Sequence, residues 1–182
     1  MIDLIIPYYN NPEGILTTLK SINLNIFNVT IVDDGSSNYL PPGLFGAQVF
    51  RYSDNRGPGR ARQWGVDHTS NPYIMFIDTG DVFISMEAQE KILEQITARP
   101  DLDFISFTYY HYDALSTIND NRMHGKVYKR SFLEKYHITF ASTSSYLNED
   151  VGFNRTCRIC ADMEFIPLPV IKQIRDDNSL TQ

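Results

Sequence analysis

The chain has 182 residues, of which 42% are hydrophobic and 21% are charged, and its formal net charge is −6. This length and composition predict one well-buried globular domain over 1–182 and argue against a second independent core. The acidic balance argues against a nucleic-acid-binding protein, because such proteins usually carry a basic face.

Short apolar runs rich in β-branched residues alternate with helical patterns in the first part of the chain. We expect strands at about 2–6, 28–33, 47–52, 73–77 and 103–108, and helices at 13–25, 59–69 and 86–98. Alternating strands and helices form right-handed βαβ units, so the sequence predicts a Rossmann-like α/β fold with a mainly parallel sheet flanked by helices. Ligands of such sheets bind outside the carboxyl ends of the strands.

Three of the expected strands end in a polar or acidic cluster. The clusters are Pro7-Tyr8-Tyr9-Asn10, Asp33-Asp34-Gly35-Ser36 and Asp78-Thr79-Gly80-Asp81. Together they bring two tyrosines, an amide and four carboxylates to one rim of the sheet. This combination predicts a nucleotide and metal site.

The cluster from Asp78 to Asp81 is the most specific of the three. Gly80 allows a positive φ, and a turn brings its end Cα atoms within about 7 Å. Two carboxylates that close can share a divalent cation that also binds substrate phosphates. The competing interpretation is a plain strand-end turn in which Asp78 caps nearby amides.

The other two clusters are less specific. A carboxylate of Asp33 or Asp34 can accept a hydrogen bond from a nucleobase N–H or a ribose hydroxyl, although Asp-Gly-Ser is also common turn chemistry. Tyr8 and Tyr9 point to opposite faces of their strand, so one can stack on a base while the other packs in the core. The nearby basic cluster suits a diphosphate or, equally, a solvated helix start, and consists of Arg51, Arg56, Arg60 and Arg62.

Beyond residue 108 the pattern is less regular. We expect a strand near 125–128, a helix near 130–136, another helix from about 148 and, because prolines interrupt it, an edge strand over 165–171. Glu149 and Asp150 open the last helix, with Asn148 as its N-cap. Adjacent helical residues diverge by about 100°, so one carboxylate can face a cleft while the other braces the backbone. A carboxylate near a helix N-terminus stays ionised, as a general base must be, but a charged first turn is also ordinary.

Other chemical motifs are missing from the sequence. Cys157-x-x-Cys160 has no second pair at zinc-site spacing and is better interpreted as buried small side chains. There is no P-loop, and Arg56-Gly57-Pro58-Gly59-Arg60 lacks the third glycine of a Rossmann fingerprint. No metal-ligand spacing is found among the histidines, which are His68, His111, His124 and His137.

In this order, the motifs resemble those of family 2 glycosyltransferases with the GT-A fold, over nearly the whole chain. The clusters at positions 7–10 and 32–36 are similar to the family's Pro-x-Tyr-Asn and Val-Asp-Asp-Gly-Ser. Asn55-Arg56-Gly57 with Ala61-Arg62-Gln63 resembles its Asn-x-Gly and Ala-Arg-Asn. The segments at 78–81, 125–130, 148–151 and 178–181 resemble its Asp-x-Asp motif, acceptor-side strand, Glu-Asp motif and closing segment.

The resemblance implies a role for each motif. Residues 1–107 would form a nucleotide-sugar-binding half and 108–182 a small acceptor-side half. The implied nucleotide-sugar-binding residues are Pro7, Tyr8, Asn10, Asp33, Asp34, Gly57, Arg62 and Asp78. Asp81 with Asp78 would bind Mn²⁺ or Mg²⁺, and Asp150, with Glu149 beside it, would be catalytic as the base.

The implied activity is inverting transfer of a single sugar from a nucleotide-diphosphate sugar, usually a uridine one, to a hydroxyl group of a glycan, lipid carrier or protein. The sequence has no Gln-x-x-Arg-Trp motif, which argues against processive polysaccharide synthesis. Gly80 stands where the family often has an acidic residue, so a degenerate, non-catalytic nucleotide-sugar-binding domain is the alternative. A nucleotidyltransferase would show a Gly-x-Gly-x-Arg loop where Pro7-Tyr8-Tyr9-Asn10 stands.

The sequence also bears on location. No apolar stretch approaches the roughly 18 residues needed to span a bilayer, and no signal peptide precedes the first strand. Two cysteines do not make a disulfide framework, which is typical of a reducing compartment. We therefore expect a cytoplasmic enzyme without a transmembrane segment, for which peripheral membrane contact stays open.

Overall fold

A computed structural model of the chain describes residues 1–117, 121–140 and 149–174. Its strands form one nine-stranded sheet. The strands are β1 (Ile2–Tyr8), β2 (Phe27–Asp33), β3 (Gln48–Arg51), β4 (Tyr73–Phe76), β5 (Val82–Phe83), β6 (Phe104–His111), β7 (Ala114–Leu115), β8 (Lys126–Lys129) and β9 (Met163–Lys172). The helices are α1 (Pro12–Lys20), the short 3₁₀ helix η1 (Leu44–Gly46), α2 (Pro58–Asp67), α3 (Met86–Ala98), α4 (Arg130–Lys135) and α5 (Glu149–Cys160).

The strand order is β3-β2-β1-β4-β8-β6-β9-β5, and β7 pairs with β6. The strands β3, β2, β1 and β4 are mutually parallel, as are β6 and β9. β8 is inserted antiparallel between β4 and β6. The carboxyl ends of β1, β2 and β4 therefore meet at one rim, and the predicted α/β class with a mostly parallel sheet is confirmed.

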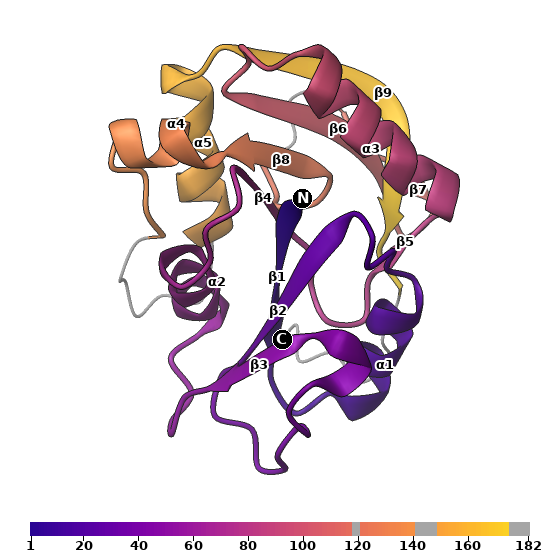
Figure 1. Cartoon of the computed structure of the whole chain (residues 1–182), viewed down its shortest axis with the longest axis vertical. Coiled ribbons are helices and arrows are strands. Elements are labelled where there is room, and N and C mark those ends of the chain that lie inside the picture. The colour runs from indigo at the N-terminus through magenta and orange to yellow at the C-terminus, as the bar shows by residue number, and fades with distance from the viewer. Residues whose placement is uncertain (118–120, 141–148, 175–182) are drawn as a thin grey trace.

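Helices cover both faces of the sheet (Figure 1). On one face, buried residues of α1 and α3 pack with side chains of β1 such as Leu4 and Ile6. On the other face, Ile5 and Phe76 pack with residues of α4 and α5, including Phe132 and Phe153. Burying each such large apolar side chain contributes roughly 1.5–3 kcal/mol, so these two layers hold the rim in place. None of the described helices is long and apolar enough to cross a membrane.

Two expectations about elements need correction. The first helix ends at Lys20 rather than at residue 25, because the chain turns there: the N–H of Ser21 donates to the carbonyl of Thr18 at 3.0 Å. β9 has one partner strand, β6, along most of its length, but at its end it is not an edge strand, because Ile171 and Lys172 also pair with β5. Its prolines are tolerated because the β6–β9 register shifts where Pro169 lies opposite Thr108.

Candidate active site and metal centre

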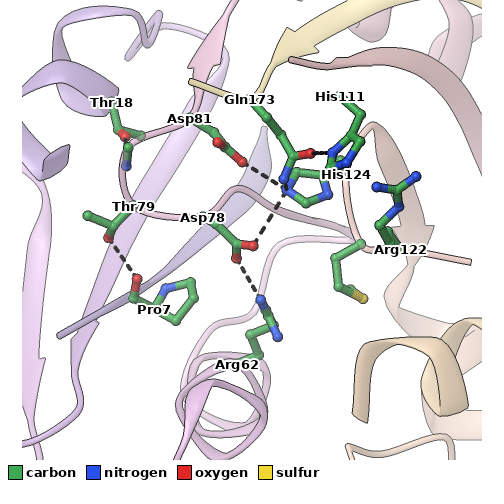
Figure 2. A network of polar contacts seen from close by, with 12 residues as sticks. Pro7, Thr18, Arg62, Asp78, Thr79, Asp81, His111, Arg122, His124 and Gln173 are labelled. Carbon is green, nitrogen blue, oxygen red and sulfur yellow. Dashed lines mark hydrogen bonds and ion pairs between the residues drawn. The ribbon is translucent and has the colours of Figure 1, made fainter. Parts of the chain in front are cut away.

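The turn after β4 holds Asp78 and Asp81 at the carboxyl rim of the parallel strands. The N–H of Asp81 donates to the carbonyl of Asp78 at 3.0 Å, and Gly80 adopts φ +101°, a value that favours glycine. The hydroxyl of Thr79 donates to the carbonyl of Pro7 at 2.7 Å (Figure 2). The N–H of Gly80 donates to the hydroxyl of Thr18, on α1, at 2.9 Å. The two carboxylates are therefore fixed by contacts with β1 and α1.

His124 joins these two carboxylates. Its Nε2 lies 2.8 Å from Oδ2 of Asp81 and 3.5 Å from Oδ2 of Asp78, and Figure 2 shows both contacts. One ligand atom from each of the three residues lies within 4.8 Å of the others, so they form a candidate metal centre. The spacing of the histidines along the sequence does not identify His124 as a metal ligand. Strand register does: Met75 lies opposite Val127, and continuing this antiparallel register by three residues puts His124 opposite Asp78.

The charges in this cluster depend on one another. Burial works against a charged His124, but its contacts with Asp78 and Asp81 outweigh burial and raise the pKa of the imidazole to about 9. Desolvation also works against a charged Asp78, yet Arg62 and His124 outweigh it and lower the pKa of this carboxyl. Burial raises the pKa of Asp81. The charge of Asp78 is thus stabilised by its positive neighbours, whereas burial disfavours the charge of Asp81, a cost that a divalent cation between the two carboxylates would offset.

Arg62 connects the metal centre to the start of α5. Its guanidinium donates to Oδ1 of Asp78 at 2.6 Å and to Oε1 of Glu149 at 3.0 Å, and its side chain is 5% exposed. Gly59 permits the close approach of α5, since a Cβ there would lie 2.6 Å from Cγ of Glu149. Burial works against the charge of Arg62, but the nearby carboxylates outweigh it and raise the pKa of the guanidinium. One buried arginine thus ties α2, the β4 turn and α5 together.

The two carboxylates that open α5 have different surroundings. Glu149 is ion-paired with Arg62. Asp150 is half-buried, and its Oδ1 accepts the N–H of Val151 at 2.8 Å. The N-cap expected at Asn148 lies outside the described residues. One carboxylate therefore braces the helix against a buried arginine, and the other is held by the backbone of the first turn.

Asp34 fixes the loop that leads into α2. Its two carboxylate oxygens accept the backbone N–H groups of Arg56 and Gly57, each at 2.8 Å. Gly57 adopts φ +88° at the N-cap of α2. The predicted nucleotide-binding residues Asp34 and Gly57 are thus brought together, and Asp34 shapes the loop through its own hydrogen bonds.

Asp33 keeps an acceptor atom at the rim. Its Oδ1 accepts the N–H of Ser36 at 2.9 Å. Its buried Oδ2 has no hydrogen-bond partner in the part of the chain that the structure describes, and it lies 3.9 Å from Nε of Arg51. One buried carboxylate oxygen of Asp33 is therefore left without a hydrogen bond among the described residues.

The first polar cluster links the end of β1 to the loop after β2. Tyr8 is 2% exposed and packs in the core, where burial raises the pKa of its phenol, whereas Tyr9 is 46% exposed. The N–H of Asn10 donates to the hydroxyl of Ser36 at 2.9 Å, and its Oδ1 accepts the N–H of Ser37 at 2.8 Å. Asn10 thus organises the rim, and of the two tyrosines only Tyr9 has a substantially exposed ring.

Unpartnered polar atoms gather at this rim. Among the described residues, the buried atoms without a hydrogen-bond partner include Asp33 Oδ2, Arg62 Nε, Asp81 Oδ2 and His124 Nδ1. Asp81 Oδ2 lies near the imidazole, but without hydrogen-bond geometry. Leaving such an atom unsatisfied costs about 1–3 kcal/mol, which a ligand can offset. Two carboxylates suit Mn²⁺ or Mg²⁺ and the imidazole adds a nitrogen donor, so the residues present fit a divalent cation.

The sequence matches a known protein family and several of its members. The model of the family "Glycosyl transferase family 2" matches residues 3–155. An uncharacterized glycosyltransferase of Haemophilus influenzae is 29% identical over 126 residues, which are 66% of this chain and 41% of the relative. The amylovoran biosynthesis glycosyltransferase AmsB of Erwinia amylovora is 30% identical over 119 residues, which are 57% of this chain and 39% of the relative. The aligned part is thus about two-fifths of each relative's length.

Solved structures share the fold. TarS 1-349 of S. aureus in complex with UDP-GlcNAc has a TM-score of 0.82 at 17% identity, covering 98% of this chain and 59% of that one. The mannosyltransferase PcManGT of Pyrobaculum calidifontis in complex with GDP-Man and Mn²⁺ has a TM-score of 0.73 at 14% identity, covering 97% of this chain and 57% of that one. The predicted GT-A fold is therefore confirmed. With a family match over residues 3–155 and an acidic rim on this fold, the chain belongs to glycosyl transferase family 2.

Proposed function

We propose that this domain transfers a single sugar, with inversion, from a UDP-sugar to an acceptor hydroxyl, with Mn²⁺ or Mg²⁺ held by Asp78, Asp81 and His124. The observation that carries the proposal is the convergence of these three side chains with Arg62 and the start of α5 at the carboxyl rim of a family 2 sheet. Solved relatives with this fold bind UDP-GlcNAc in one case, and GDP-Man with Mn²⁺ in another.

The cation would be held by carboxylate oxygens of Asp78 and Asp81 and by Nε2 of His124. A divalent ion bound there supplies Lewis-acid stabilisation of the departing nucleoside diphosphate. Gly80 has no side chain to contribute, and His124 supplies the third donor instead. This arrangement supports a metal site that does not depend on an acidic residue at position 80.

Asp33 supports uridine as the base of the donor. Uracil presents one N–H between two carbonyls, whereas guanine presents two adjacent N–H donors beside one carbonyl. One oxygen of Asp33 accepts the N–H of Ser36, and the other has no hydrogen-bond partner among the described residues. Nearby Arg51 already donates its Nε and Nη2 to the carbonyls of Tyr52 and Ser36. One acceptor matches the single N–H of uracil, while guanine would require a second acceptor.

The roles of the other rim residues follow from their contacts. Arg62 would face the donor diphosphate, because its Nε has no hydrogen-bond partner within the described ranges of the chain. Asp150 would take the proton of the acceptor hydroxyl as that oxygen attacks the anomeric carbon opposite the leaving diphosphate, which inverts the centre. Glu149, ion-paired with Arg62, would position the helix that carries Asp150. Tyr8, Asn10, Asp34 and Gly57 would shape the nucleoside pocket, together with Pro7.

The chain would act as one domain whose two halves meet at the metal centre. Asp78 and Asp81 belong to the nucleotide-sugar-binding half, 1–107, whereas His124 and Asp150 belong to the acceptor-side half, 108–182. The acceptor would be a hydroxyl of a glycan, a lipid carrier or a protein. A non-catalytic nucleotide-sugar-binding domain is the alternative, and it would keep the donor site but lack a working base.

Thermal unfolding with UDP and with GDP, each with and without Mn²⁺, tests the donor site. A ligand at a hundred times its Kd adds about 2.7 kcal/mol, and each kcal/mol raises Tm by roughly 2–4 °C for a domain of this size. We expect a shift of several degrees with UDP and Mn²⁺ together. A shift that needs no Mn²⁺ would remove the metal from the proposal, and a larger shift with GDP would overturn the assignment of uridine.

Asp150→Asn separates the enzyme from the binding domain. With UDP-GlcNAc as the probe and water as the acceptor, we expect release of UDP to fall about 10²–10⁴-fold. The UDP-induced rise in Tm should stay as in the wild type, because Asp150 takes no part in nucleotide binding. Release of UDP by the variant at the wild-type rate would show that Asp150 is not the base.

A further inference from the structure

A pocket separate from the metal centre opens at the β5 edge of the sheet, where the hairpin between β6 and β7 meets the end of β9 (Figure 1). Its volume is about 280 Å³, and its lining includes Val82, Ile84, Tyr110, Tyr112, Asp113 and Lys172. Strand register brings these residues together, because Val82 lies opposite Lys172 and Lys172 lies opposite Tyr110. Paired residues of neighbouring strands point to the same face, so one row of side chains forms the floor of the pocket.

The pocket adjoins the metal centre but is lined by other side chains. β5 begins directly after Asp81, and Tyr110 directly precedes His111 at the end of β6. Consecutive residues of a strand point to opposite faces. Tyr110 accordingly lines the pocket, whereas the ring of His111 contacts the amide of Gln173, which lies 3.0 Å from Nε2 of His124. A molecule in the pocket would therefore be a neighbour of the metal centre and not a part of it.

Tyr112 has a backbone conformation that tyrosine rarely adopts. With Asp113 it forms the two-residue turn between β6 and β7, and its φ is +56°. Such turns favour glycine and asparagine, because a larger side chain crowds the backbone at positive φ. The ring of Tyr112 lines the pocket and also contacts that of His111, with 4.5 Å between the ring centroids. A bulky aromatic residue at a strained position indicates a function for its ring, since the turn itself would be more stable with glycine.

Lys172 and Asp113 add polar groups to the same lining. Nζ of Lys172 lies 4.0 Å from Oδ1 of Asp113, and the side chains are 48% and 99% exposed. An exposed pair of this kind contributes little to stability. An ammonium group donates hydrogen bonds and a carboxylate accepts them, whereas a sugar hydroxyl does both, so neighbouring hydroxyls of one sugar can bind both groups. The opposite charges balance, which favours a neutral sugar residue.

We propose that this pocket binds one neutral sugar residue of the acceptor, so that the acceptor is a glycan. The face of a tyrosine ring is electron-rich and attracts the C–H groups of a sugar ring, and both Tyr110 and Tyr112 line the pocket. Its volume is near the lower end of the range of ligand pockets, about 300–1,000 Å³, and suits one sugar ring better than a nucleotide. Only the role of this sugar as part of the acceptor rests on the proposed function.

Titration of the isotope-labelled chain with neutral sugars, followed by nuclear magnetic resonance, tests the pocket without donor or metal. The probes are the methyl glycosides of glucose, galactose, mannose and N-acetylglucosamine. We expect at least one of them to bind saturably and to shift the amide signals of Val82, Tyr112 and Lys172. Tyr112→Gly and Lys172→Met should each weaken its binding about tenfold. The matched control is Tyr136→Gly, the same change at an exposed tyrosine after α4, which should leave sugar binding unchanged.

The strain at Tyr112 separates loss of binding from loss of folding. Glycine relieves the positive φ, so Tm of Tyr112→Gly should stay level or rise while sugar binding falls. If Tyr112→Gly unfolds, Lys172→Met decides the assignment, because it changes an exposed side chain. Absence of binding for all four glycosides overturns the sugar site, and so does wild-type sugar binding in both variants.

The acceptor role has its own measurement, with UDP-GlcNAc as the donor and disaccharides of the bound sugar as acceptors. Tyr112→Gly should raise KM for the disaccharide, and an unchanged KM or no transfer overturns the acceptor role. The sugar site and the proposed function can fail separately. A chain that binds sugar but shows no Tm shift with UDP and Mn²⁺ loses only the proposed function, whereas a chain that binds UDP and no sugar loses only the sugar site.

Discussion

Charged side chains are buried at both ends of the parallel strands, but they are satisfied at only one of them. At the amino end of β1, Oδ1 of Asp3 accepts from the amides of Asn28 and Asn71, at 2.8 and 2.7 Å. Its Oδ2 accepts from the N–H of Asn71 at 2.7 Å and from Arg130 at 2.9 Å. Arg130 donates further to two backbone carbonyls and a hydroxyl.

The carboxyl rim also buries aspartate and arginine side chains, but it leaves some of their hydrogen bonds unmade. Asp33, Asp81, Arg62 and His124 each keep a buried atom without a hydrogen-bond partner there, among the residues that the structure describes. A saturated buried ion pair has no capacity left for a ligand, whereas an unsaturated one gains free energy when a ligand arrives. The degree of saturation, and not the presence of charge, therefore separates a structural cluster from a binding site.

The largest effect should come from removing the ion pair between Arg130 and Asp3 at the amino end of β1, where every hydrogen bond of the carboxylate is made. Arg130→Met leaves Asp3 buried without its cation, and we expect the free energy of unfolding to fall by about 3–5 kcal/mol, because an uncompensated buried charge is costly. Urea unfolding measures this loss. Lys129→Met is the matched control, because this half-buried residue donates only a solvent-exposed bond to a backbone carbonyl, among the described residues, and the change should alter stability by less than about 1 kcal/mol. A loss below 1 kcal/mol in Arg130→Met would contradict the comparison.

Asp81→Asn should separate function from stability at the other end. We expect Mn²⁺ binding to weaken about 100-fold, since a charged oxygen ligand is lost from the centre. Without Mn²⁺, Tm should stay level or rise, because the neutral amide removes a carboxylate whose pKa burial already raises. Asp113→Asn, at a side chain that is 99% exposed, serves as the control for calorimetry. A marked fall in Tm would mean that Asp81 is structural, like Asp3.

Asp33→Asn tests the free acceptor at the nucleoside side. In the variant, an amide N–H can stand where the wild-type carboxylate oxygen accepts the N–H of the base. We therefore expect UDP to bind about tenfold more weakly, which is about 1.4 kcal/mol. Titration calorimetry measures this change, and Asp101→Asn, an exposed residue far from the rim in sequence, is the control. Equal UDP affinity in the variant would remove Asp33 from base recognition.

The smallest expected effect is the contribution of Asp3 to the loss of stability at low pH. Burial works against a charged Asp3, but its bonds from Asn28, Asn71 and Arg130 outweigh burial and lower its pKa below 3.8. The stability that this group adds is present above its unfolded pKa and is lost as the pH falls from about 4 toward the folded value. Denaturant unfolding between pH 6 and pH 3 should therefore be flatter for Asp3→Asn than for the wild type. Parallel curves would show that Asp3 does not contribute to the acid response.

The position of the rim could be inferred from the sequence because it depends on local patterns. Short continuous apolar runs mark the buried strands, and the polar residues that follow them must lie at their carboxyl ends. The turn with Gly80 between Asp78 and Asp81 is also local, and the structure forms it as predicted. Helix ends were less well determined, as the stop at Lys20 shows, because the bonds that end the helix compete with its continuation.

The sequence by itself determined the α/β class, the family motifs and the carboxylates of the rim. Only the tertiary structure decided which distant residues complete them. His124 meets Asp78 through an antiparallel strand inserted into the sheet, Arg130 meets Asp3 across the amino end, and Gln173 reaches the cluster at the end of β9. The physical reason is that strand pairing sets these contacts through register and strand order, and residues far apart in the chain leave no trace of that pairing in local periodicity.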